Sequence, residues 1–247
     1  MNQIYIPKNR LGMASGSFVI VKPIEQQEVA SNPILYGFSH LEPIKMEIIH
    51  RIFHIADRTL EEIKNIIITG SFLEEGFYFN DIDIVVISEK SITQELAGNI
   101  TSEIGIKSHI INLTSKELAK GIESDPLYLN IISKCVAKNR IVFNIQRKIN
   151  FQLLDFHLLK SKAVINNFDY LSGREVYYLT KNMLAILLFM EGKKVSSELI
   201  DKEIKILFHL SANNIKDKIL KKQEFISEYK KVYDKIFKRI LEKNAAK

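Results

Sequence analysis

The sequence predicts an α+β protein in which a short β element, a small mixed-sheet domain and an all-α domain follow one another. Three observations predict this order. Proline and glycine interrupt residues 1–40, helical and strand patterns alternate over residues 41–120, and the pattern over residues 121–247 is mostly helical. We therefore expect domain boundaries near residues 40 and 120.

The N-terminal segment, residues 1–40, is typical of short strands around a tight turn. It holds Pro7, Pro23 and Pro33 together with three glycines, and its apolar residues come in short runs. Proline and glycine punctuate local structure, so this segment is expected to form a β element rather than a helix.

The middle segment, residues 41–120, has the element order of a small sheet domain. Apolar residues recur at helical spacing over 41–63, and continuous apolar runs follow the pattern of buried strands. The expected elements are a helix over 41–63, strands over 65–71 and 81–88, a helix over 91–104 and a strand over 106–114.

The C-terminal segment, residues 121–247, is expected to form the helical domain. Residues 139–144 (NRIVFN) are a candidate for one last short strand. Residues 173–194 are apolar nearly all round, with Gly173 and Gly192 as punctuation, which predicts the buried core helix of this domain.

Composition indicates a globular protein with a real core. The chain has 247 residues, of which 46% are hydrophobic and 26% charged. The longest wholly apolar run, residues 183–190, is much shorter than the roughly 20 residues that span a bilayer, and the N-terminus has no secretory pattern. A single cysteine, Cys135, excludes an internal disulfide. We expect a cytoplasmic protein without membrane association.

Positive charge gathers at the C-terminal end. Residues 193–247 carry 15 Lys and Arg against 8 Asp and Glu, a net charge of +7, whereas residues 1–192 carry 20 against 21. Such a stripe could meet a polyanion such as RNA. The alternative is the solvated face of lysine-rich helices, because acids are interleaved with the bases.

One motif carries chemistry. An apolar strand ends in Gly70-Ser71, nine residues follow, and Asp81-Ile82-Asp83 then opens a second apolar strand. Side chains two positions apart on a strand share a face, so the two carboxylates repel each other unless a cation lies between them. Mg²⁺ prefers such oxygen ligands, and a Gly-Ser turn can bind phosphate oxygens. The alternative is a surface strand whose aspartates cap the loop.

This motif resembles that of the nucleotidyltransferase superfamily typified by DNA polymerase beta, including the minimal and kanamycin-type enzymes. The resemblance covers residues about 45–115. It implies transfer of a nucleoside monophosphate from ATP or another nucleoside triphosphate to a hydroxyl, with release of pyrophosphate. It also implies Mg²⁺ at Asp81 and Asp83 and nucleotide contacts from Gly70 and Ser71.

The chain departs from this family at the third acidic residue, which the family usually places on the next strand. The polar residues of the matching strand here are His109 and Asn112. We assign the catalytic position to His109, because a neutral imidazole can accept a proton or bind a metal. The alternative is an ordinary strand histidine.

The helical segment resembles the HEPN-like domains that accompany minimal nucleotidyltransferases. No histidine follows an arginine at the four-to-six-residue spacing of the HEPN ribonuclease motif, so we do not expect that activity. The resemblance implies that this segment walls the nucleotide site. Candidates to contact phosphates or the base are Lys162, Tyr177 and Lys181, with Lys160 and Arg174 as further ones.

Two functions from different classes follow. The first is a Mg²⁺-dependent nucleotidyltransferase whose acceptor is a protein, an RNA or a small molecule. The second is a catalytically silent nucleotide- or RNA-binding regulator on the same fold. The sequence leaves the acceptor, the nucleobase and homo-oligomerisation open.

Overall fold

The computed structural model of the protein describes residues 32–60, 62–90, 93–142 and 146–245. All of them belong to one compact unit, Ser31–Lys247. Most of the expected N-terminal β element lies outside the described residues. Its last part contains a short strand, β1 (Ile34–Tyr36).

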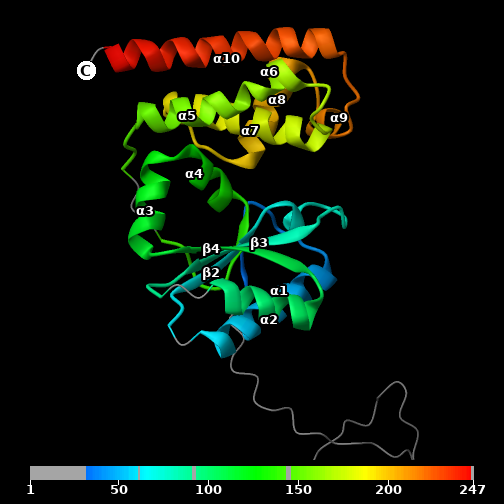
Figure 1. The fold of residues 1–247 in the computed structure, drawn as a ribbon, viewed down its shortest axis with the longest axis vertical. Coiled ribbons are helices and arrows are strands. Elements are labelled where there is room, and N and C mark those ends of the chain that lie inside the picture. The colour runs from blue at the N-terminus through cyan, green and yellow to red at the C-terminus, as the bar shows by residue number, and fades with distance from the viewer. Residues whose placement is uncertain (1–31, 61, 91–92, 143–145, 246–247) are drawn as a thin grey trace, which may run out of the picture. The chain divides into compact units, whose positions relative to one another are not determined.

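The α+β class expected from the sequence is confirmed. A five-stranded mixed sheet has the order β1-β5-β2-β3-β4, with α1 (Pro43–Thr59) and α2 (Thr93–Ile104) on one side of it and α3 (Ser115–Ser124) and α4 (Pro126–Ser133) on the other (Figure 1). The other strands are β2 (Asn65–Thr69), β3 (Asp81–Ile87), β4 (Lys107–Leu113) and β5 (Cys135–Ala137). Within this sheet β3 and β4 run parallel, and the other neighbouring pairs run antiparallel.

The prediction of a strand over residues 139–144 is wrong. The last strand of the sheet is instead β5, Cys135–Ala137, whereas residues 139–142 form no strand and 143–145 lie outside the described residues. β5 pairs with both β1 and β2. The sheet therefore draws strands from both sides of the boundaries expected at residues 40 and 120.

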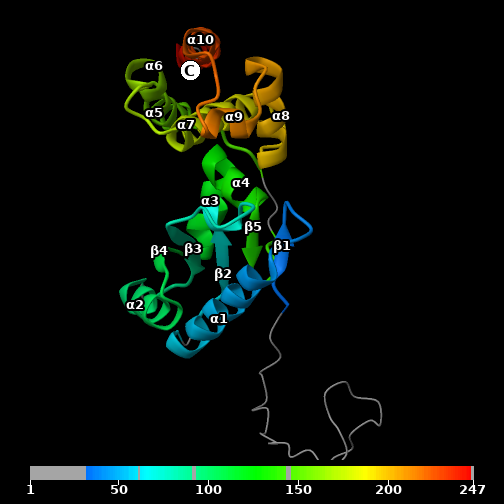
Figure 2. The same cartoon turned by 90° about the vertical axis from the view of Figure 1, so that its right-hand side faces the viewer.

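Alternate residues of β3 face two different hydrophobic layers. Ile82, Ile84 and Val86 pack with α1 (Pro43–Thr59) and α2 (Thr93–Ile104). Val85 and Ile87 face the opposite way, towards α3 (Ser115–Ser124) and the residues before β5. Figure 2 shows α1 and α2 side by side below the strands. By the same alternation, Asp81 and Asp83 lie on the α3 face of the sheet.

The helical part has a hydrophobic core of its own. It comprises the elements α5 (Phe151–Ser161), α6 (Ala163–Asn167), α7 (Gly173–Met190), α8 (Ser197–Phe208), α9 (Ala212–Lys216) and α10 (Lys222–Ala245). A short helix of the sheet part, α4 (Pro126–Ser133), packs against α7.

The buried helix expected over 173–194 is confirmed as α7. Ser172 accepts from the backbone of Glu175, whose carboxylate accepts from the backbone of Ser172 in return, so a capping box starts the helix. Twelve of its 18 residues are buried. This central helix therefore organises the helical core.

The basic excess of the C-terminal segment is partly paired with acids. Among the described residues of this segment, seven cations make ion pairs: Lys193, Lys216, Lys221, Lys222, Lys231, Lys238 and Arg239. Most of these pairs are exposed, so each contributes little to stability. They do reduce the positive charge that a polyanion would meet. In the described part of the chain, no helix is both long and apolar enough to cross a membrane.

Candidate active site

The two aspartates lie where β3 begins, beside the end of β2. Thr69, Asp83 and His109 form one row across β2, β3 and β4, because Asp83 is in register with both of the others. Directly paired residues share a sheet face. The structure thus places the side chains of Asp83 and His109 together, which sequence alone could not fix.

Gly70 follows β2 with a backbone that a side chain would not tolerate. Its φ is 82° and its ψ is −160°, a region that is essentially restricted to glycine. A Cβ built on Gly70 would overlap Oδ2 of Asp83 and lie 3.0 Å from its Cγ. The absent side chain is therefore what lets the Asp83 carboxylate lie against the turn, with exposed Ser71 next in the chain.

The negative charge of the Asp83 carboxylate is only partly compensated by its neighbours. Burial, followed by the neighbouring Asp81 carboxylate, raises the pKa of Asp83, and a contact with His109 opposes this effect. His109 Nδ1 lies 3.4 Å from Asp83 Oδ1. Asp81 itself is exposed. The arrangement favours a cation near the pair, because a cation would relieve the unfavourable charge.

The loop after Gly70 is fixed to α1 by a buried lysine. Lys45 is fully buried and donates to Glu42 Oε1 at 3.1 Å and to the backbone oxygen of Glu74 at 2.5 Å. Glu42 in turn accepts from the backbone of Gly76 at 2.8 Å. The Lys45 ammonium also lies 5.4 Å from the ring centre of Phe77. These contacts hold residues 74–77 in one position.

The same loop contacts the helical part. Lys216 donates to Glu74 Oε2 at 2.7 Å, and Arg174 donates to the backbone oxygen of Tyr78 at 2.8 Å. Lys216 also lies 4.5 Å from the ring centre of Tyr177. The loop between Gly70 and Asp81 is thus held against the start of α7 and the end of α9.

Two of the three expected nucleotide contacts from the helical part face this loop. Burial lowers the pKa of Lys181, and the charges of Glu74 and Asp201 oppose that effect. Tyr177 donates to Asp201 Oδ1 at 2.9 Å, and burial raises its pKa. Lys181 and Tyr177 therefore lie within electrostatic range of the acidic loop.

Lys162 lies elsewhere. It is exposed at the junction of α5 and α6, next to Ser161, whose backbone oxygen accepts from Tyr229 of α10. Figure 1 shows α6 beside α10. The structure does not bring Lys162 to the residues of the motif.

Sequence reasoning missed two lysines near the loop. Lys134 and Lys216 both act on the pKa of Lys181, and the backbone oxygen of Lys134 lies 3.5 Å from Thr69 Oγ1. No sequence spacing connects these residues to the motif, because α4 and α9 bring them there. Together with Lys181 they form what we call the lysine cluster: Lys134, Lys181 and Lys216.

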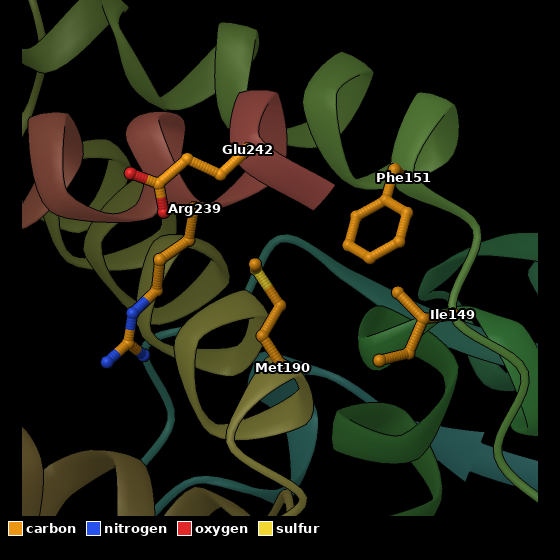
Figure 3. Close-up of a pocket in the computed structure, with 5 residues that line it drawn as sticks. All are labelled: Ile149, Phe151, Met190, Arg239 and Glu242. Carbon is orange, nitrogen blue, oxygen red and sulfur yellow. The ribbon is translucent and has the colours of Figure 1, made fainter. Parts of the chain in front are cut away.

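A separate hollow lies in the helical part, away from the motif. It has a volume of about 280 Å³, and Figure 3 shows the residues that line it: Ile149, Phe151, Met190, Arg239 and Glu242. Arg239 is paired with Glu191 at 3.0 Å. None of the expected site residues lines this hollow.

Neither the metal ligand set nor the family assignment receives independent support. Among the described residues, no group of three or more His, Cys, Asp and Glu side chains is arranged to hold a metal ion. No model of a known protein family matches the chain, and a search of curated proteins found no match.

Proposed function

We propose that the protein is a nucleotidyltransferase. It transfers a nucleoside monophosphate from ATP or another nucleoside triphosphate to a hydroxyl acceptor and releases pyrophosphate, with Mg²⁺ as cofactor. In this proposal residues around the sheet form a nucleotidyltransferase domain, and the helical part is HEPN-like. The observation that carries the proposal is the packing of the Asp83 carboxylate, beside Asp81, against Gly70.

The residues present fit a divalent cation. Asp81 and Asp83 supply carboxylate oxygens, which are the donors that Mg²⁺ prefers, and the raised pKa of Asp83 records repulsion and burial that a cation would offset. Both side chains reach solvent, so a metal-bound triphosphate can approach. When bound, Mg²⁺ would neutralise phosphate charge and orient the phosphates.

The turn and the lysine cluster suit the triphosphate. Gly70 and Ser71 offer a backbone without a side chain at the first position and a hydroxyl at the second. Lys181 and Lys216 supply positive charge from the helical part, and Lys134 supplies it from the end of α4. The ring of Tyr177 is buried in the helical core beside the Lys216 ammonium. Lys216 is paired with Glu74, and Lys181 lies in the field of Asp201 and Glu74, so a bound phosphate would share these two lysines with the carboxylates.

The reaction needs only positioning and charge stabilisation from these residues. The oxygen of the acceptor hydroxyl forms a bond to the α-phosphorus. The bond from the α-phosphorus to the oxygen shared with the β-phosphate breaks, and pyrophosphate leaves with that electron pair. The hydroxyl proton passes to a base or to water. Two roles are chemically open to His109: accepting that proton or ligating the metal.

The proposal is tested by pyrophosphate release from ATP and Mg²⁺ in the presence of total cell RNA or total cell protein. Release is expected with one of the two acceptor pools and not with Asp83→Asn. Glu75→Gln is the matched control, because it neutralises an exposed carboxylate of the same loop. Release that is equal for Asp83→Asn and the unchanged chain would contradict the proposal.

One observation favours the alternative, a catalytically silent nucleotide- or RNA-binding regulator. The described strand β4 carries no carboxylate, and His109 stands in register with Asp83 where the third acid of the family is expected. Such a regulator would bind Mg²⁺ and ATP without turnover. If it bound RNA instead, its affinity would fall steeply with salt, since each neutralised phosphate releases counterions.

A further inference from the structure

The metal preference of the site can be inferred from the side chain that β4 places beside Asp83. His109 is in register with Asp83 on the neighbouring parallel strand. The side chain of His109 is 65% exposed and that of Asp83 is 37% exposed, so an ion from solvent can reach both. No helix or loop has to move to bring the two donors together.

The distance between these two donors is informative. His109 Nδ1 and Asp83 Oδ1 are 3.4 Å apart, which is longer than the roughly 2.7–3.2 Å of a good N–H···O hydrogen bond. Two donors that each lie about 2.1 Å from one ion are separated by roughly 3.0 Å at a right angle and 3.4 Å at a tetrahedral angle. The pair is therefore better spaced for sharing a cation than for bonding to each other.

The chemistry of the donors separates one class of ion from another. Mg²⁺ is a hard cation that takes oxygen ligands, whereas imidazole nitrogen suits first-row transition ions. Thiolate ligands are not offered here, because the single cysteine, Cys135, is buried in β5. A pair that offers one imidazole and one carboxylate thus favours transition ions while still accepting Mg²⁺.

We propose that His109 ligates the metal of this site together with Asp83, and that the site prefers a divalent first-row transition ion such as Mn²⁺ or Co²⁺ over Mg²⁺. The inference rests on the proposed function, because it concerns the metal of the same site. It assigns His109 to metal binding rather than to removal of the hydroxyl proton. A histidine that acted only as a base would leave the metal preference unchanged.

The test measures metal binding rather than activity. Co²⁺ and Mg²⁺ are titrated calorimetrically into the full chain with an ATP analogue that has a methylene group between the α- and β-phosphates. The unchanged chain is compared with His109→Asp, which restores a carboxylate, and with His54→Asp, the same change at an exposed position of α1. Because the phosphates of the analogue are the same in each experiment, a change in the Co²⁺-to-Mg²⁺ affinity ratio between variants reports the contribution of the substituted side chain.

We expect the ratio to fall at least about tenfold in His109→Asp and to stay unchanged in His54→Asp. Pulsed electron paramagnetic resonance of bound Mn²⁺ adds a readout that does not depend on a variant's folding, since nitrogen coupling is expected in the unchanged chain. An unchanged Co²⁺-to-Mg²⁺ affinity ratio in His109→Asp, together with no nitrogen coupling in the unchanged chain, would overturn this inference. The proposed function would still stand in that case if Asp83→Asn loses metal binding. No metal binding in the unchanged chain would overturn both.

Discussion

Replacing Gly70 by alanine tests whether the turn after β2 holds the Asp83 carboxylate in place. The φ of 82° and ψ of −160° at Gly70 disfavour any side chain, and the new Cβ would overlap Asp83 Oδ2. The backbone term alone is about 1–3 kcal/mol. Overpacking against Asp83 adds about 1 kcal/mol. We therefore expect Gly70→Ala to lower the free energy of unfolding by about 2–4 kcal/mol.

The two contributions can be separated with matched variants. Gly105 has a φ of +80° and no heavy atom within 4 Å of an added Cβ, so Gly105→Ala reports the strain of a positive φ without a clash. In an Asp83→Ala background the overlap with Oδ2 and Cγ is removed and only a 3.2 Å contact with the Cβ of residue 83 remains, so the destabilisation by Gly70→Ala should fall by about 1 kcal/mol. Urea denaturation of the single and double variants gives these free energies.

Gly70→Ala should also lose affinity for the metal-bound ATP analogue, because the Asp83 carboxylate must rotate away from the position that it now occupies. Gly70→Val should lose at least as much, since its branched side chain also fills space that a phosphate needs. The reasoning is refuted if Gly70→Ala matches Gly105→Ala in stability, shows no coupling to Asp83→Ala and binds the analogue as the unchanged chain does.

Three further predictions concern the carboxylates and the buried lysine. Asp81→Asn and Asp83→Asn should abolish Mg²⁺-dependent triphosphate binding, measured by calorimetry. The raised pKa of Asp83 means that its ionised form opposes folding at neutral pH, so the melting temperature of metal-free Asp83→Asn should hold or rise slightly; unfolding would show that the pair is structural. Lys45→Met should cost about 1–3 kcal/mol in urea denaturation, because Glu42 and the backbone oxygen of Glu74 lose their buried donor; a neutral result would contradict this role. The Glu42 carboxylate accepts hydrogen bonds from the backbone N–H groups of Glu42 and Gly76, which lower its pKa from 4.5 to about 2. The stabilising contribution of this carboxylate is therefore present above pH 4.5 and is lost as pH falls towards 2. The stability difference between the unchanged chain and Glu42→Gln should shrink over that window, and a difference independent of pH would count against it.

The long apolar runs and helical periods were sufficient to predict most of the sheet and its helices. β2, β3 and β4 coincide with the continuous apolar segments, and α7 with the helix that is apolar nearly all round. The last strand was predicted at the wrong residues because a three-residue strand such as β5 is too short to show an alternating pattern. The apolar residues after Arg140 were taken for the strand instead. Its pairing with β1 and β2, from distant parts of the chain, decides its position.

The site was predictable only where it depends on neighbours in the chain. Gly70, Asp81 and Asp83 follow from one local motif, whereas the row that joins Asp83 to His109 depends on the register of parallel strands. Lys134 and Lys216 reach the acidic loop through the packing of α4 and α9, which no sequence spacing encodes. Lys162 was chosen for its charge alone, and charge does not determine on which side of a helical bundle a residue lies.

Transfer of label from ATP tests the central claim most directly. ATP labelled on the α-phosphate and ATP labelled on the γ-phosphate are incubated separately with the full chain, a divalent ion and the acceptor pool, and the label that remains covalently bound to the acceptor is measured. The proposed nucleotidyl transfer predicts label from the α-phosphate alone, and none with Asp83→Asn. Label from the γ-phosphate, or equal labelling by the unchanged chain and Asp83→Asn, would contradict it.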